Sequence, residues 1–187
     1  MHGPVLVSWL LAALTATSGA YCLSRLGRTP CAADTGAGRL HAYESDAAEA
    51  LMGLGMAAMA VTGAAVPAAL WAWLFGLPAL AFLLAAAHGR TGRAHRLHHA
   101  IGGLAMTYMA LMMAAAPAHG HHHGASAGAP LLTGALLLYF GGYTLWAGTH
   151  LLAVPGGQVT RSPRTAGLPR ACRLAMGVGM FAMLLTM

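Results

Sequence analysis

The sequence predicts an all-α protein, a polytopic membrane bundle of six transmembrane helices that form three tandem helical hairpins. Two properties of the composition indicate a membrane protein. Hydrophobic residues make up 58% of the 187 residues and charged residues only 7%, whereas globular domains usually carry about a quarter charged residues. The mean hydropathy of the chain is +0.64. The third observation is a series of six apolar stretches, near the roughly 20 residues that a spanning helix needs.

The six predicted spans leave little of the chain between them. The second and third meet at Pro67 with almost no loop, which predicts a tight helical hairpin. We therefore expect a single six-helix domain over residues 1–187. The first span lacks a preceding positive charge and an obvious cleavage site, so we expect it to be retained and not removed as a signal peptide. The spans are, in order, residues 4–22, 47–66, 67–87, 99–117, 131–154 and 172–187.

The arginines indicate how these spans are oriented. The chain has no lysine, and all ten arginines follow the first, third and fifth spans, while the loops after the second and fourth contain none. The positive-inside rule places Arg-rich loops in the cytoplasm, so both termini are predicted outside. We expect a multi-pass plasma-membrane protein whose partner is the lipid bilayer. The net charge of +6 is then a topology signal and does not indicate binding to nucleic acid.

A methionine phrase recurs in each even-numbered span. It reads "MGLGMAAM" at 52–59, "GGLAMTYM" at 102–109 and "MGVGMFAM" at 176–183. Apart from Met1, every methionine lies in an even span, which predicts an ancestral two-helix unit used three times in parallel orientation. Aligning the three copies gives sets of equivalent positions. These sets are Met52, Gly102 and Met176; Met56, Met106 and Met180; Met59, Met109 and Met183; and, in the preceding turn, Glu49, His99 and Arg173.

The spacing places the methionines of each phrase on one helix face. At about 100° per residue, offsets of 0, 4 and 7 fall within about 60° of one another. Thioether sulfur is a soft, neutral ligand that suits Cu(I), and a neutral ligand also suits the bilayer centre. Histidines, acids and cysteines lie at the predicted cytoplasmic end, and the run "HGHHHG" (119–124) lies at the outer end. The candidate metal ligands are Met52, Met56, Met59, Met106, Met109, Met113, Met176, Met180, Met183, His88, His98, His99, His150 and Cys172.

We therefore expect a membrane protein that handles a soft metal ion, most simply Cu(I), as a conduit or a membrane-embedded carrier. Two alternatives stay open. Methionine fills irregular gaps in cores, so the chain could instead be a structural or assembly subunit of a larger membrane complex or a homo-oligomer. It could also be a redox protein in which two of the four histidines hold haem b, which needs opposed axial ligands. Those histidines are His88, His98, His99 and His150.

The sequence carries no motif of a common enzyme class. It has no Walker loop, no dinucleotide-binding fingerprint, no Gly-x-Ser-x-Gly elbow and no His-Glu-x-x-His helix. These absences favour a protein without catalytic residues. Cys22, Cys31 and Cys172 are all predicted on the cytoplasmic side. An odd number of thiols in a reducing compartment argues against a structural disulfide.

The phrases "EALMGLGMAAM", "HHAIGGLAMTYM" and "ACRLAMGVGMFAM" resemble an uncharacterised bacterial family of small, six-span, methionine-rich integral membrane proteins that is labelled a domain of unknown function. The resemblance covers most of the chain and implies fold and location but no activity. In that family a histidine often precedes the methionines of the second span, whereas this chain has Ala48 and Glu49 there. The Met-x-x-x-Met spacing is also similar to that of eukaryotic-type copper transporters, an analogy that concerns mechanism only.

Overall fold

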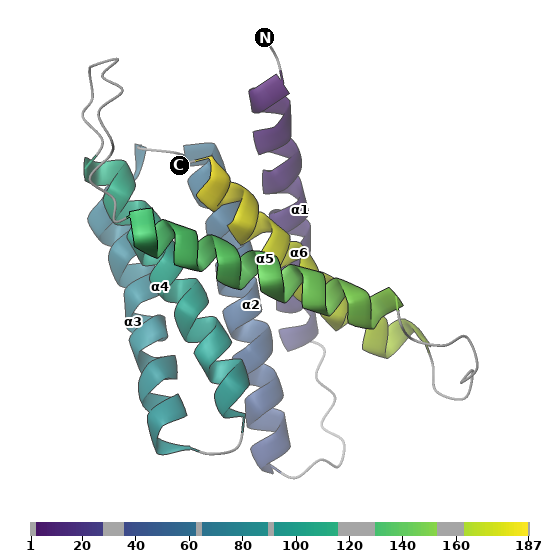
Figure 1. The fold of residues 1–187 in the computed structure, drawn as a ribbon. Helices are drawn as coiled ribbons and strands as arrows, with labels where there is room; N and C mark the ends of the chain where they lie inside the picture. Colours follow the sequence, from purple (N-terminus) through teal and green to yellow (C-terminus); the bar gives the residue numbers. More distant parts are fainter. Residues whose placement is uncertain are drawn as a thin grey trace. The chain divides into compact units, whose positions relative to one another are not determined.

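A computed structural model describes residues 3–27, 36–62, 65–89, 92–115, 130–152 and 163–186 of the chain. These ranges contain six α-helices and no strand, which confirms the all-α prediction (Figure 1). The helices are α1 (Gly3–Leu26), α2 (Gly36–Thr62), α3 (Ala68–His88), α4 (Arg93–Ala115), α5 (Pro130–Leu152) and α6 (Pro163–Leu185).

Several helices extend beyond the predicted spans at their polar ends. Helix α2 begins at Gly36 where the span was predicted from residue 47, and α6 begins at Pro163 where the span was predicted from residue 172. The apolar stretch is the part of a helix that suits lipid. The helix itself can extend further, through polar residues that also favour helical backbone. Proline is favourable in the first turn of a helix, which accounts for the start of α6 at Pro163.

Two helices in the described ranges are long and apolar enough to cross a membrane by length and composition. They are α3 over Ala68–His88 and α5 over Pro130–His150. The apolar part of α6, Ala171–Leu185, is shorter. The other helices mix their leucines and methionines with alanine, glycine, serine and threonine, which lowers their hydropathy. The structure thus supports membrane association through two helices.

Contacts divide the chain into two compact units. Unit 1 comprises Met1–Val61 and Leu138–Met183, and unit 2 comprises Thr62–Leu137 and Leu184–Met187. Unit 1 therefore contains α1, nearly all of α2, the second part of α5 and nearly all of α6. Unit 2 contains α3, α4 and the beginning of α5.

In unit 1, α1 and α2 approach closely through glycines. A methyl group at Gly53 would lie 2.9 Å from the Thr15 carbonyl oxygen, and one at Gly19 would lie 2.8 Å from the Leu54 backbone nitrogen. Small residues let helix backbones approach in this way in membrane proteins. Helix α6 packs on the same pair, since a methyl group at Gly179 would lie 2.8 Å from the Thr15 Cγ2 and 3.5 Å from the Met56 Sδ.

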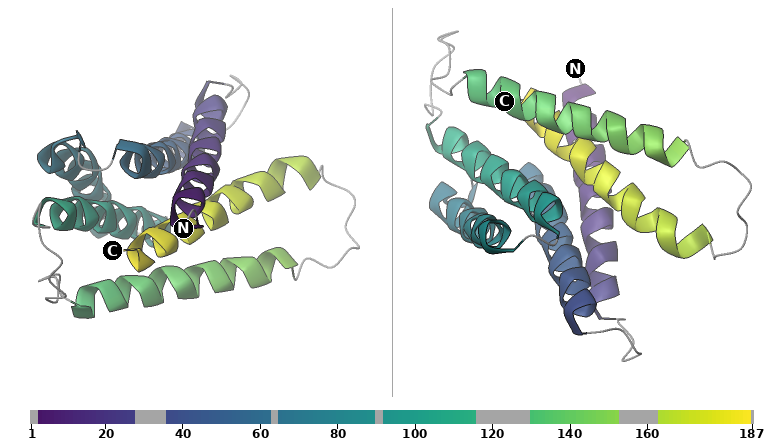
Figure 2. Two further views of the ribbon diagram at one scale, coloured as in Figure 1. Left: turned by 90° about the horizontal axis from the view of Figure 1, so that it is seen from above. Right: turned by 60° about the horizontal axis from the view of Figure 1, so that its bottom comes forward.

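In unit 2, α3 and α4 form an antiparallel pair and lie side by side (Figure 2). Gly103 of α4 lies against α3, because a methyl group there would be 2.9 Å from the Ala79 Cβ and 3.0 Å from the Phe75 carbonyl oxygen. The turn between these helices contains Gly92 at φ 71°, a left-handed conformation that favours glycine. At the turn, the Arg96 Nη1 donates to the Ala85 carbonyl oxygen at 3.3 Å.

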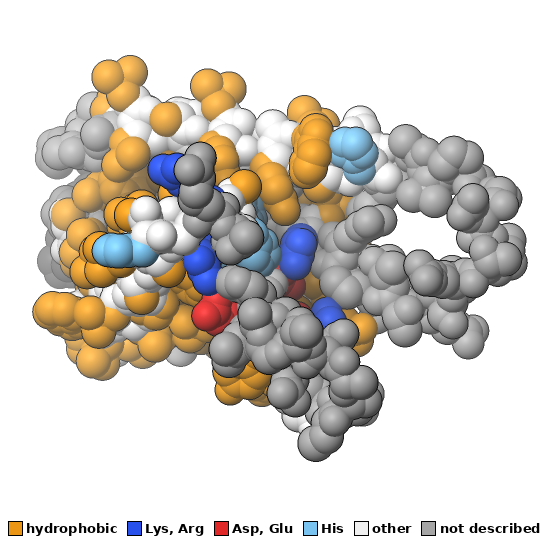
Figure 3. Space-filling model, turned by 90° about the horizontal axis from the view of Figure 1, so that it is seen from below, with side chains coloured by type: hydrophobic (Ala, Val, Ile, Leu, Met, Phe, Trp, Pro, Cys, Tyr) orange, Lys and Arg blue, Asp and Glu red, His pale blue; other side chains and the backbone are white. Residues whose placement is uncertain are grey.

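The outward-facing side chains of these helices are largely apolar. In the face shown in Figure 3, hydrophobic side chains cover much of the described surface, and charged and histidine side chains gather near its middle. On α3 and α5 the exposed residues include two tryptophans and many leucines. Examples are Leu70, Trp73, Leu77, Leu80, Leu131, Leu138, Leu145 and Trp146. A surface of this kind suits lipid better than water.

Candidate functional site

A buried ion pair joins α2 and α6 in unit 1. Glu49 on α2 is only 1% exposed, and its Oε1 accepts a hydrogen bond of 2.6 Å from the Arg173 Nε on α6. The Ser45 Oγ, one turn earlier on α2, donates to the same oxygen at 3.3 Å and accepts from the Arg173 Nη2 at 3.3 Å. The Glu49 carboxylate is thus held by a side chain of its own helix and by a side chain of α6.

Two thiols complete this cluster. The Cys22 Sγ on α1 donates to the Glu49 Oε2 at 3.5 Å, and Cys172 on α6 directly precedes Arg173 in the chain. Both cysteines are free and buried. We call the five residues the thiol–carboxylate cluster: Cys22, Ser45, Glu49, Cys172 and Arg173.

A second ion pair lies beside the cluster. The Arg25 Nη1 is 3.2 Å from the Asp46 Oδ1. Burial raises the pKa of the Asp46 carboxyl, and the Arg25 and Arg173 guanidinium groups offset part of that rise. The two arginines and two acids therefore balance one another around the thiols.

The close approach of α1 and α2 explains why these residues meet. Cys22 follows Gly19 by three residues on α1, and Glu49 precedes Gly53 by four residues on α2. Because the two helices are antiparallel and cross at these glycines, residues one turn away on each side come to face each other. The same register brings Arg25 opposite Asp46 one turn further along.

The methionines of unit 1 begin next to this cluster. Met56 and Met59 on α2 and Met176 and Met180 on α6 are buried, while Met52 and Met183 are half-buried. Met176 follows Cys172 by one helical turn, and the contact between Gly179 and the Met56 Sδ shows that the two stripes run along the same interface. The cluster thus lies at one end of a buried interface that carries methionines from both helices.

The third methionine stripe lies in unit 2. Met106 and Met109 on α4 are buried, and Met113 is half-buried. Gly102, which replaces the first methionine of the phrase, is also buried. Because α4 belongs to the other unit, the convergence of three stripes on one axis stays a prediction.

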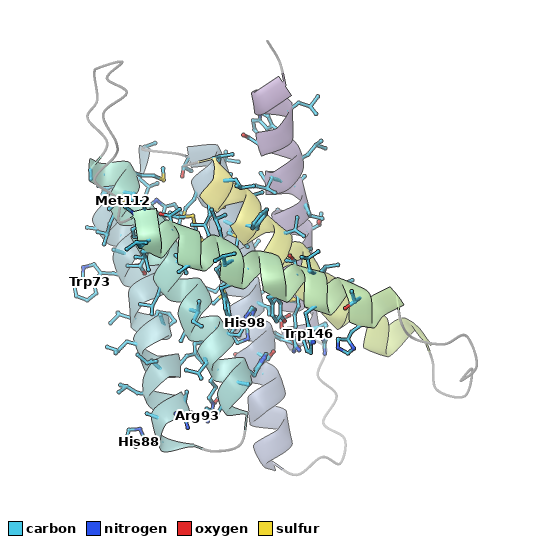
Figure 4. All side chains as sticks on the ribbon, viewed as in Figure 1. Trp73, His88, Arg93, His98, Met112 and Trp146 are labelled. Atoms are coloured by element: carbon cyan, nitrogen blue, oxygen red, sulfur yellow. The ribbon has the colours of Figure 1, made fainter. Side chains whose placement is uncertain are left out.

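The predicted histidine ligands have different surroundings. His99 is buried on α4; its Nε2 is 3.1 Å from the Nε2 of His95, one turn earlier. The rings of His98 and Phe82 flank His99, with centroids at 5.9 and 5.4 Å. His88, labelled with His98 in Figure 4, is exposed at the end of α3, where its Nδ1 is 2.8 Å from the Leu84 carbonyl oxygen.

His150 is exposed on α5 and lies against Trp146, with ring centroids 4.7 Å apart. Among the described residues, no group of three or more His, Cys, Asp and Glu side chains is placed to hold one metal ion. Cys31 and the run at 119–124 lie outside the described residues. The structure therefore gathers Cys172, but neither His88 nor His150, into a polar cluster.

Five residues of these clusters were not among the predicted ligands. They are Cys22, Ser45, Glu49 and Arg173 in unit 1 and His95 in unit 2. A signal for two of them was present in the repeat alignment, because Glu49, His99 and Arg173 are equivalent positions. Glu49 and Arg173 stand at equivalent positions of two apolar helices. Charged side chains in such helices usually pair with each other, so these positions indicate a buried ion pair.

Comparison with known proteins gives one match. No curated protein and no solved structure matches the chain. A family model matches residues 41–187, from the first part of α2 to the end of the chain. The match confirms the resemblance to an uncharacterised family, and it leaves Cys22 and Arg25 of α1 outside the matched region. Because it covers most of the sequence, the chain belongs to the family described as a domain of unknown function (DUF5134).

Proposed function

We propose that the chain is a six-span protein of the plasma membrane that handles a soft metal ion, Cu(I), as a conduit or a membrane-embedded carrier. The methionines of α2, α4 and α6 would be its ligands along the path. The bilayer and the metal ion are its partners in this proposal. The Arg-rich loops would face the cytoplasm and both termini the outside.

One observation carries the proposal, namely that methionine and aliphatic residues occupy opposite faces at equivalent positions of the three phrases. Met56, Met106 and Met180 are each at most 2% exposed. Two residues earlier in each phrase the side chain is 38–49% exposed and is never methionine. The outer residues are Leu54, Leu104 and Val178.

Packing alone does not require this separation. Leucine and methionine have similar volumes, and exchanging them in a core usually costs less than about 1.5 kcal/mol. A chain that needed only buried apolar volume could use leucine inside, as it does outside. Sulfur differs from a methylene group in its affinity for soft metals, so its restriction to the inner face supports a ligand role.

The membrane part of the proposal is supported by α3 and α5, which are long and apolar enough to cross. It is also supported by the apolar outer surface and by the arginines, which all follow odd-numbered predicted spans. The remaining helices would cross because their polar positions are small or face inward. Thr15, for example, is buried and donates to the Leu11 carbonyl oxygen at 3.0 Å.

X-ray absorption of the purified protein, loaded with Cu(I) under reducing conditions, tests this function. We expect sulfur-only coordination that is lost when Met56, Met106 and Met180 are replaced together by leucine. Met112→Leu is the matched control, because Met112 is half-buried on α4 and lies outside the repeated phrase (Figure 4). Unchanged copper coordination in the triple variant would refute the proposal.

The two alternatives make different predictions for the same sample. An assembly subunit would co-purify with a partner, and its docking surface would be the exposed leucines of α5, since Met56, Met106 and Met180 are buried. A haem protein would show a Soret band when purified. Its axial ligands would have to include His99, because His88 and His150 are exposed and contact residues of their own helices.

A further inference from the structure

We infer that His95 and His99 of α4 form a chelating pair that binds one divalent transition-metal ion, such as Zn²⁺ or Cu²⁺, through their two Nε2 atoms. The inference goes beyond the proposed function, because it concerns a different class of ion and a site whose protein ligands are nitrogen atoms. It adds His95 to the candidate ligands, and both residues lie within unit 2.

The distance between the two imidazole rings is the first argument. The Nε2 atoms of His95 and His99 are 3.1 Å apart, and the ring planes cross at 85° with centroids 4.4 Å apart. Imidazole nitrogen binds zinc at about 2.0–2.1 Å. At an ion bound at that distance, the two atoms would subtend about 100°, between the roughly 90° of square-planar and the roughly 109° of tetrahedral coordination. The pair therefore has the spacing of a chelate.

The positions of the two histidines along α4 are the second argument. Residues four apart lie one turn apart on the same face of a helix. In the His-Glu-x-x-His helix of zinc proteases, two histidines at this spacing bind one zinc ion, and the glutamate acts as the general base. Residues 95–99 read "HRLHH", so Arg96 stands where that motif has glutamate. The pair thus has the ligand spacing of the motif without its catalytic acid.

The surroundings of the pair hold one ligand in place and leave the other accessible. His99 is only 2% exposed. The rings of Phe82 on α3 and His98 on α4 lie beside it, with centroids at 5.4 and 5.9 Å. Packing of this kind preserves the geometry of a ligand before the ion binds. His95 is half-buried, so an ion can reach the pair from its side.

The type and number of ligands select the ion. Imidazole suits Zn²⁺, Cu²⁺ and Ni²⁺, whereas soft sulfur ligands select Cu(I). In the described ranges no third His, Cys, Asp or Glu is placed to complete the set. Water would take the remaining positions, as it does at open zinc sites. The pair is therefore a site for an exchangeable ion and differs from a closed structural zinc site.

Binding leaves the charge of the two rings unchanged. When both rings are neutral, one Nε2–H donates to the other Nε2, so one ring carries its proton on Nε2 and the other on Nδ1. An ion bound to both Nε2 atoms requires both protons on Nδ1. The donating ring gives its Nε2 proton to water and takes one from water at Nδ1, so no net proton is released.

Calorimetric titration with Zn²⁺ tests the site. The run at 119–124 would also bind divalent ions, so the starting protein is the full chain in detergent with the four histidines of that run replaced by alanine. It is purified without a histidine tag. We expect His95→Gln to weaken the tightest Zn²⁺ site by at least about 10-fold, the lower range for disturbing a metal site.

His88→Gln is the matched control for this titration. His88 is exposed at the end of α3, and its replacement should leave Zn²⁺ binding as it is in the starting protein. Equal binding by His95→Gln and the starting protein would overturn the inference. The absence of Zn²⁺ binding by the starting protein would overturn it as well.

A second measurement identifies the ligands without a substitution at the buried His99. Electron spin-echo modulation of the Cu²⁺-loaded protein responds to the remote nitrogen of each imidazole that is bound to copper. We expect the pattern of two imidazoles in the starting protein and of one at most in His95→Gln. The same pattern in both proteins would place the bound imidazoles elsewhere and refute the pair.

The inference and the proposed function can fail independently. The Zn²⁺ titration reports on a site without thioether ligands, and the Cu(I) absorption experiment reports on sulfur coordination. If Zn²⁺ binds as expected while Cu(I) shows no sulfur coordination, the histidine pair stands and the methionine path fails. The reverse result supports the methionine path and removes the histidine pair.

Discussion

At the scale of single residues, the most unusual feature is Glu49, a buried acidic side chain on the apolar helix α2. A buried carboxylate is costly unless it is paired and hydrogen-bonded, and charged groups within membrane helices usually mark function. The Glu49 carboxylate is paired and hydrogen-bonded in this way by Arg173, Ser45 and Cys22. These partners account for how the Glu49 side chain can be charged at 1% exposure.

Replacing Glu49 by glutamine tests the strength of this pair. The amide oxygen can still accept a hydrogen bond from Arg173, but the charge is lost. The amide NH2 group takes the place of the carboxylate oxygen beside Cys22. We expect the free energy of unfolding in detergent to fall by about 1–3 kcal/mol, less than for a fully buried pair because the Arg173 side chain is 38% exposed.

Glu44→Gln is the control for this substitution, because Glu44 is an exposed carboxylate on the same helix. Its effect should stay within about 0.5 kcal/mol. A loss of stability at Glu44 equal to that at Glu49 would contradict the assignment of the pair. The measurement is reversible unfolding by a denaturing detergent, followed by circular dichroism.

At the scale of helices, glycines decide which faces meet. The contact between Gly19 and Gly53 fixes the register of α1 on α2, and that register brings Cys22 to Glu49. The contact of Gly103 with Ala79 and Phe75 does the same for α4 on α3.

Gly53→Ala tests the helix contact. The new methyl group would meet backbone atoms of Thr15 and Gly19 at 2.9–3.0 Å, and backbone cannot move aside as a flexible side chain can. We expect a loss of about 1–3 kcal/mol in unfolding free energy, as for other overpacked sites. Gly134→Ala on α5 should cause no loss, because a methyl group there meets nothing within 4 Å. Equal stability of the two variants would refute the close packing.

The sequence predicts the helices well and their contacts poorly. Apolar runs place all six helices, because burial and lipid both select hydrophobic residues over about 20 positions. They miss the first eleven residues of α2, from Gly36 to Asp46, because these are polar and helical at once. The contact between Cys22 and Glu49 was not predicted, because it depends on how α1 crosses α2, which no local pattern in α1 reveals.

At the scale of the whole molecule, the distribution of arginine predicts an orientation that fusions can test. Alkaline phosphatase is active only outside the cytoplasm, so its fusion after residue 187 should be active in a bacterial host. Its fusion after residue 91, in an Arg-rich loop, should be inactive, and green fluorescent protein at that position should fluoresce. The positive-inside rule supplies the reason. The reverse pattern of activities would contradict the proposed topology.

The proposed handling of Cu(I) depends on sulfur acting as a ligand at the buried faces of α2, α4 and α6. The most direct measurement is the metal content of the purified protein by mass spectrometry, before and after a chelator wash. We expect copper that survives the wash in the unmodified chain and in Met112→Leu. We expect it to be absent when Met56, Met106 and Met180 are leucine. Copper that is absent from the unmodified chain, or retained equally by the leucine variant, would contradict the central claim.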